Sequence, residues 1–207
     1  YWYPEATSQA VEDSGLRGCI SAVVVGLKKD WQKDLEAGSE DLLTKFPPER
    51  HPRIKVWLGP HAPYSCDEKV LKKIIDIGKK FGLPIHTHAS ETKDGIGGIE
   101  QLERAGIFSL PTLVAHCVWP KESEIKILKK HRVAVAHCPT ANLKLADGVA
   151  PTWKMIRAGV EVGLGTDGPA SNNSLNILAE AKLASILAKT TSRDPTALAA
   201  YQTLEMA

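Results

Sequence analysis

The chain has few cysteines, and none of them forms a C-x-x-C pair. The four cysteines stand alone at Cys19, Cys66, Cys117 and Cys138. In a chain of 207 residues this spacing speaks against a disulfide framework and against a zinc ribbon. We therefore expect reduced thiols and a cytoplasmic location.

Long apolar runs and blocks of like charge are also absent. The longest apolar runs, such as residues 20–26, fall far short of the ~20 residues that span a bilayer. Lys and Arg number 26 against 24 acidic residues, which gives a net charge of +2. Charge therefore gives no case for binding nucleic acid or an anionic membrane. With 43% hydrophobic residues, the composition is that of a soluble globular protein.

Short β-branched runs alternate along the chain with amphipathic segments of helical period. The pattern predicts strands over residues 19–26, 54–59, 83–89, 112–118, 133–138 and 161–166. It predicts helices over residues 4–14, 67–81, 99–105, 121–130, 151–158 and 174–189. Asp67 is the expected N-cap of the second helix, and Gly82 is expected to end it.

Strands and helices in this order predict right-handed β-α-β units and a parallel sheet. The pattern itself leaves two architectures open, a doubly wound open sheet and a (β/α)8 barrel. No linker of low complexity divides the chain, and the 13 prolines are scattered. We therefore predict a single domain over residues 1–207.

Titratable side chains stand at the carboxyl ends of five successive strands. They are His61, His88, His116, His137 and Asp167. In a barrel these ends meet at one mouth, where imidazoles and a carboxylate suit a divalent metal. Any one of them alone could be a hydrogen-bonded structural residue, and Asp167 could be a turn former. Five in series favour a site.

The third strand delivers an H-x-x-E pattern, His88 and Glu91. A metal ligand followed three residues later by a carboxylate that can relay protons suits metal-assisted hydrolysis. His86 points to the same face as His88, so the two could be an H-x-H metal pair. We prefer the interpretation that His86 packs one layer deeper in the barrel.

A glycine-rich stretch, Gly95-Ile96-Gly97-Gly98, follows a strand as a dinucleotide loop would. The full G-x-G-x-x-G pattern requires glycine at position 100, which is Glu100, and a carboxylate there would repel a phosphate. We interpret the stretch as a loop beside the mouth of the site.

The residues at the strand ends resemble those of the amidohydrolase superfamily, in its methylthioadenosine/S-adenosylhomocysteine deaminase and chlorohydrolase branch. The similar segments run in the order of the branch and cover nearly the whole chain. They are residues 59–64 (GPHAPY), 88–92 (HASET), 115–118 (AHCV), 137–145 (HCPTANLKL) and 165–173 (GTDGPASNN).

The resemblance implies a (β/α)8 TIM-type barrel that binds one divalent metal, zinc as first choice and iron as the alternative. It implies that His88 and Asp167 are metal ligands and that Glu91 is the proton shuttle. His116 would lie beside the metal-bound hydroxide and donate a hydrogen bond to the developing oxyanion-like centre. His61 would contact a purine ring. The resemblance gives His137 no ligand role.

The chain also departs from the branch. The family's first strand carries an H-x-H pair that supplies two further ligands, and nothing before His51 can serve. We therefore expect strands three to eight of the barrel here, without the first two strands and the accompanying β-sandwich. The domain is then incomplete, and the start at Tyr1 without Met agrees with this expectation. The loop after Glu91 is shorter than is usual in the family, and Ala141 replaces a common Ser.

The resemblance implies hydrolytic deamination of a purine nucleoside-like substrate of the adenosine, methylthioadenosine or S-adenosylhomocysteine type, with release of ammonia. Within the branch, the alternatives are a guanine or pterin deaminase and a triazine chlorohydrolase. Arginines that some methylthioadenosine deaminases carry after the third barrel strand are absent from residues 22–25. A different class, a barrel that binds a nucleotide without hydrolysing it, also stays open. We expect a small-molecule substrate, no nucleic acid, no membrane, and a homodimer as one option.

Overall fold

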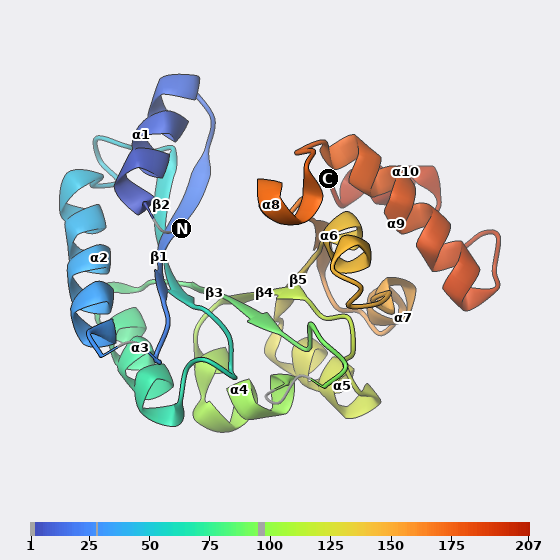
Figure 1. Cartoon of the computed structure of the whole chain (residues 1–207), viewed down its shortest axis with the longest axis horizontal. Helices are drawn as coiled ribbons and strands as arrows, with labels where there is room; N and C mark the ends of the chain where they lie inside the picture. Colours follow the sequence, from blue (N-terminus) through green and yellow to red (C-terminus); the bar gives the residue numbers. More distant parts are fainter. Residues whose placement is uncertain (1–2, 28, 95–97) are drawn as a thin grey trace. The chain divides into compact units, whose positions relative to one another are not determined.

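The fold is known from a computed structural model that describes residues 3–27, 29–94 and 98–207 (Figure 1). The chain divides into two compact units. Unit 1 consists of Tyr1–Thr87 and Arg104–Thr112, and unit 2 consists of His88–Glu103 and Leu113–Ala207.

The described residues contain a sheet whose strand order follows the sequence. The strands are β1 (Gly18–Val24), β2 (Ile54–Pro60), β3 (Ile85–Ala89), β4 (Thr112–His116), β5 (Ala134–His137) and β6 (Val162–Leu164). The pairings of β1 with β2, β2 with β3, β4 with β5 and β5 with β6 are all parallel. The predicted parallel α/β arrangement is therefore confirmed, and most of the predicted strands were one or two residues too long at their ends.

All six predicted helices are present. They are α1 (Pro4–Ser14), α3 (Glu68–Phe81), α4 (Ile99–Ala105), α5 (Glu122–His131), α7 (Thr152–Arg157) and α9 (Ile177–Ser192). The pattern missed four helices and a 3-10 turn: α2 (Trp31–Lys45), α6 (Pro139–Lys144), α8 (Pro169–Asn172), α10 (Ala200–Glu205) and η1 (Ile107–Ser109). In α2 the poor helix formers Gly38 and Ser39 interrupt the pattern, while Trp31, Leu35 and Leu42 are buried.

The helix α3 shows how its sequence specifies it. The Asp67 carboxylate accepts a hydrogen bond from the Val70 amide at 2.9 Å, which caps the first turn. Gly82 ends the helix in the left-handed region at φ 65°. Its apolar stripe, which includes Val70, Ile74 and Ile77, is buried. Both predicted caps are confirmed.

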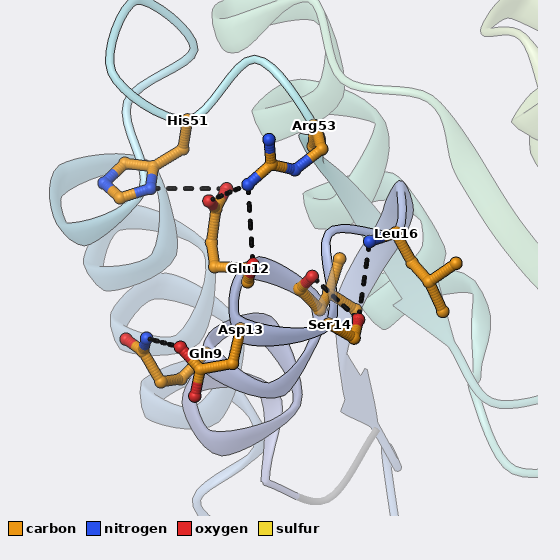
Figure 2. Close-up of polar contacts among 8 residues, drawn as sticks. Gln9, Glu12, Asp13, Ser14, Leu16, His51 and Arg53 are labelled. Carbon is orange, nitrogen blue, oxygen red and sulfur yellow. Dashed lines mark hydrogen bonds and ion pairs between the residues drawn. The ribbon is translucent and has the colours of Figure 1, made fainter.

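An ionic network holds α1 to the segment before β2 in unit 1 (Figure 2). Arg53 donates to the Glu12 carboxylate at 2.9 Å, and His51 Nδ1 lies 3.4 Å from the other Glu12 oxygen. The Gly18 amide donates to the Arg53 carbonyl at 2.9 Å, and from there β1 and β2 stay in register from Gly18↔Ile54 to Val24↔Pro60. The network thus fixes the start of the longest strand pair in unit 1.

In unit 2, α9 packs against α10 and α7 (Figure 1). The buried carboxylate of Glu180 in α9 accepts from the Thr140 amide at 3.0 Å and from Asn172 Nδ2 at 2.9 Å. Thr140 is the second residue of α6 and Asn172 is the last residue of α8, so one side chain joins three helices.

Three further points of the sequence analysis concern the cysteines, the glycine-rich stretch and membrane spans. All four cysteines are free, as predicted. Residues 95–97 of the glycine-rich stretch lie outside the described residues, so its interpretation stays a prediction. Among the described helices none is long and apolar enough to cross a membrane.

Candidate active site

Unit 2 carries four of the predicted site positions at the carboxyl ends of its strands. His88 is the fourth residue of β3, and His116 and His137 are the last residues of β4 and β5. Asp167 follows β6 after two further residues. The predicted placement at strand ends is therefore confirmed for all four.

Three of the predicted residues lie together, and we call His88, Glu91 and His116 the histidine–glutamate cluster. The rings of His88 and His116 stack with centroids 5.4 Å apart and planes inclined by 17°. His116 Nε2 lies 3.6 Å from Glu91 Oε1. His116 is only 2% exposed, whereas the side chain of Glu91 is 20% exposed. The cluster thus joins a buried imidazole to a carboxylate that solvent or a ligand can reach.

The other nitrogen of His116 has a partner that the sequence did not single out. His116 Nδ1 lies 2.8 Å from Oδ1 of Asn142 in α6, and Asn142 is 1% exposed. Asn142 belongs to the N-L-K-L part of a segment that resembles the family. The contact between Asn142 and His116 joins α6 to β4 across 26 residues of sequence. Residue spacing alone does not reveal such a contact.

The backbone at these strand ends is left-handed at residues that bear side chains. Ser90 has φ 52°, His116 has φ 73°, Cys117 has φ 47° and Asp167 has φ 59°. Such a conformation costs about 1–3 kcal/mol at a residue other than glycine, and strained residues gather at functional sites. The strained backbone of unit 2 therefore includes residues that the sequence places at the candidate site, and this strain lowers the stability of the fold.

Asp167 is exposed and held by its own turn. Its carboxylate accepts from the Gly168 amide at 2.7 Å and from the Ser171 hydroxyl at 2.6 Å. Its charge helps to raise the pKa of Asp147, although burial of Asp147 is the larger cause. Asp167 thus belongs to the same electrostatic environment as Glu91, whose charge also raises the pKa of Asp147.

Asp147 is a second residue that the sequence analysis missed. Its carbonyl accepts a hydrogen bond from the indole of Trp119 at 2.6 Å, and its amide donates to the Asn142 carbonyl at 2.8 Å. Within the described residues its Oδ2 is buried without a hydrogen-bond partner. The segment after α6 is therefore anchored beside the cluster and carries a further carboxylate there.

Two thiols and one histidine near these strand ends stay uncharged. Burial raises the pKa of the Cys117 thiol, and burial followed by the charge of Asp167 raises that of Cys138 to about 12. Neither thiol is therefore an activated nucleophile. Burial, and then the charge of His116, lowers the pKa of His137 to about 4, so its imidazole is neutral at pH 7.

The remaining two predicted positions have different surroundings. His61 belongs to unit 1, where its Nδ1 lies 2.8 Å from the Ser65 hydroxyl and its ring meets Tyr64 edge to face at 5.6 Å. Its contact with a purine ring stays a prediction. His86 is exposed, and the expectation that it packs one layer deeper in the barrel stays a prediction. Alternation along β3 puts it on the same, less buried face as His88.

The two residues predicted to hold a metal are of types that bind metal ions, but they are too few to form a complete site. An imidazole from His88 and a carboxylate from Asp167 are ligands that zinc accepts. Among the described residues, however, no three His, Cys, Asp or Glu side chains form one group that could hold a metal ion. Metal binding by His88 and Asp167 therefore stays a prediction.

Proteins similar to this chain include deaminases named for adenosine derivatives. A 5-methylthioadenosine/S-adenosylhomocysteine deaminase of Pelotomaculum thermopropionicum is 41% identical over 216 residues, which cover 100% of this chain and 50% of the relative. A 5'-deoxyadenosine deaminase of Methanothermobacter thermautotrophicus is 40% identical, with 100% of this chain and 51% of the relative covered. The chain thus spans about half the length of the curated relatives it matches.

A solved structure gives the same fold. The crystal structure of an adenosine deaminase from Xanthomonas campestris with bound zinc superposes with a TM-score of 0.91 at 30% sequence identity. The superposition covers 100% of this chain and 49% of that one. This likeness confirms the predicted α/β barrel-type fold. The sequence profile of the amidohydrolase family matches residues 2–207, and the chain belongs to that family.

Proposed function

We propose that the protein is a metal-dependent hydrolase that deaminates a purine nucleoside-like substrate of the adenosine, methylthioadenosine or S-adenosylhomocysteine type and releases ammonia. The observation that carries this proposal is the histidine–glutamate cluster, in which Glu91 Oε1 lies 3.6 Å from His116 Nε2 at the end of parallel strands. A carboxylate that is reachable and paired with an imidazole is suited to moving protons.

The relatives narrow the substrate class. Two relatives at about 40% identity are named for deamination of adenosine derivatives, and the solved structure at 30% identity is an adenosine deaminase. We extend that substrate class to this protein, with a small molecule as its partner. Residues 1–207 would form one incomplete hydrolase barrel domain of a cytoplasmic enzyme, with a homodimer as an option.

Each residue of the site would then have a separate task. Glu91 would protonate the ring nitrogen next to C6 and later help ammonia to leave. His116 would lie beside the attacking water and stabilise the attack, and Asp167 would accept a proton from that water. His61 would contact the purine ring. These tasks divide proton transfer between two carboxylates and leave the histidines to orient water and substrate.

His88 and Asp167 would hold the divalent metal, with zinc as first choice and iron as the alternative. When bound, the metal supplies a Lewis acid that lowers the pKa of water towards ~7. The H-x-H pair that the family adds has no counterpart before His51 in this chain. Zinc in the related adenosine deaminase supports the metal's identity.

A second candidate is a barrel that binds a nucleotide without hydrolysing it, because no three ligand-type side chains of the described residues form one group. Zinc separates the two candidates. If the protein binds zinc in its native state only, added zinc must raise the melting temperature, as the hydrolase proposal expects. If the histidines are structural and bind no metal, added zinc would leave the melting temperature unchanged.

The deciding experiment replaces Glu91 by Gln and measures ammonia release from adenosine-type substrates. The amide cannot carry a proton between water and the ring, so we expect turnover to fall by ~10²–10⁴-fold or more. Stabilisation by zinc should persist because Glu91 is not assigned as a ligand. The matched control is Glu103→Gln, since Glu103 pairs with Lys130 and His131 on the surface. Near-normal activity of Glu91→Gln would contradict the proposed role.

A further inference from the structure

The hydrogen bond between His116 and Asn142 restricts which ring nitrogen carries hydrogen. Asn142 Oδ1 lies 2.8 Å from His116 Nδ1, and an amide oxygen can only accept. Nδ1 is therefore the donor. His116 and Asn142 are 2% and 1% exposed, so bulk water does not compete for this bond. In the neutral imidazole the lone pair is then left on Nε2.

The backbone of Asn142 is held in the first turn of α6, whereas its side-chain Nδ2 is buried without a hydrogen-bond partner within the described residues. The helix α6 begins with Pro139 directly after Cys138, and the Asn142 amide donates to the Cys138 carbonyl at 3.0 Å. The buried carboxylate of Glu180 accepts from the Thr140 amide at 3.0 Å. The first turn of α6 is thus tied to α9, and Asn142 Oδ1 faces His116 Nδ1.

We infer that Asn142 is a positioning residue that fixes His116 in its Nδ1–H tautomer, so that Nε2 presents a lone pair on the side of Glu91. This inference deepens the proposed function and rests on it, since His116 and Glu91 are the groups to which that function assigns the reaction. Nε2 lies 3.6 Å from Glu91 Oε1 and 5.4 Å separates the two stacked rings of His116 and His88. Because the proposed function assigns proton transfer to Glu91, Nε2 is the nitrogen of His116 that faces the reaction.

A lone pair at Nε2 changes what His116 does. The neutral ring accepts a hydrogen bond at Nε2, from the O–H of the attacking water or of a protonated Glu91. The resemblance implied the opposite direction, a hydrogen bond donated by His116 to the developing negative charge. With Nδ1 bonded to Asn142, the ring can donate from Nε2 only after a proton has reached that nitrogen.

The tautomer can be observed directly by long-range ¹H–¹⁵N NMR on protein labelled with ¹⁵N-histidine. Ring nitrogens with and without hydrogen have well separated shifts, and His116→Gln assigns the signals of His116. At a pH where the ring is neutral, we expect hydrogen on Nδ1 alone. Hydrogen on Nε2, or an even mixture of the two tautomers, would overturn the inference. The readout does not depend on turnover, so an inactive protein with this tautomer would count against the proposed function only.

Variants of Asn142 test whether this residue sets the tautomer. Asn142→Asp retains an acceptor, and Nδ1 should keep its hydrogen. Asn142→Leu has a similar size and no acceptor, and the fraction of Nδ1–H should fall at least several-fold, with a larger drop in kcat than rise in KM. If that variant does not fold, Asn142→Ala gives the same comparison. An unchanged tautomer in the apolar variants would overturn the inference.

The matched control is Asn176→Leu. Asn176 caps α9 by accepting from the Leu178 and Ala179 amides at 3.1 and 3.2 Å, so this variant loses stability at an exposed helix end. The His116 tautomer should stay as in the unsubstituted protein, which separates loss of the specific bond from general destabilisation.

Discussion

The two units differ in which residues occupy the left-handed region of the backbone. In the described part of unit 1 those residues are Gly15, Gly82 and Gly106. In unit 2 they include nine residues with side chains: Ser90, His116, Cys117, Arg132, Ala146, Asp167, Asn173, Arg193 and Leu198. Glycine takes this conformation without strain, whereas a residue with a side chain is strained in it. In unit 2 four of these residues, Ser90, His116, Cys117 and Asp167, lie at the candidate site, whereas Arg132, Asn173 and Arg193 are helix C-caps.

The buried polar side chains divide in the same way. Among the described residues, those of unit 1 are all hydroxyls: Ser8, Ser39, Ser65, Thr87 and Thr112. Unit 2 buries imidazoles, amides and carboxyls as well, among them His116, His137, Asn142 and Glu180. Burying such groups is costly unless each has a partner. In unit 2 these buried groups include both candidate-site residues, His116 and Asn142, and the structural link Glu180.

The largest effect on stability is expected for Glu180→Leu in unit 2. The substitution removes the buried acceptor of the Thr140 amide and one of the two acceptors of Asn172 Nδ2, which keeps its bond to the Thr166 carbonyl at 2.7 Å. Two hydrogen bonds to a charged group and the desolvation of their donors correspond to about 3 kcal/mol or more of the free energy of unfolding. Urea unfolding followed by circular dichroism measures it. A loss below 1 kcal/mol would show that these buried groups do not hold unit 2 together.

The free energy of unfolding should depend on pH because His137 has a lowered pKa in the folded protein. Its pKa falls from 6.5 in the unfolded chain to about 4 in the fold, so the unfolded state binds more protons between these pH values. Its contribution is fully present above pH 6.5 and is lost as the pH falls towards about 4, in total about 3 kcal/mol. Unfolding of His137→Leu should lack this part of the pH dependence. Identical pH profiles of the variant and the unsubstituted protein would contradict the assignment.

Much of the fold could be predicted because its signals are local. The β-branched runs and the caps of α3 at Asp67 and Gly82 identify elements from a few residues. The helix α2 escaped because Gly38 and Ser39 lower its propensity, and only packing of Trp31 and Leu35 compensates for this.

The candidate site was predictable in position and only partly in its contacts. The order of strand ends and the H-x-x-E spacing placed His88, Glu91 and His116 correctly. The amide of Asn142 and the carboxylate of Asp147 could not be assigned, because their proximity to the cluster depends on how α6 returns over β4. Such contacts between distant segments leave no periodic signal in the sequence.

In unit 1 the loss of a polar network should matter less. Glu12→Ala removes the partner of Arg53 and His51 (Figure 2). The Arg53 side chain is 42% exposed, so water can solvate its outer nitrogens, although Arg53 Nε and His51 Nδ1 are buried. We expect a loss of about 1 kcal/mol or less in the free energy of unfolding, and a smaller loss in high salt. A loss as large as that of Glu180→Leu would break the contrast between the two units.

The smallest effects come from a reciprocal pair of substitutions in the left-handed region. Gly82→Ala in unit 1 introduces a side chain at φ 65°, and we expect a loss of about 1 kcal/mol because the space around it is open and strain alone counts. Ala146→Gly in unit 2 relieves φ 61°, and we expect a gain of about 0.5 kcal/mol, since added freedom of the unfolded chain offsets part of the relief. Denaturant midpoints of both variants check the signs. If Ala146→Gly is destabilising, the left-handed conformation of Ala146 is not strained. The contrast in backbone strain between unit 1 and unit 2 would then not hold at this residue.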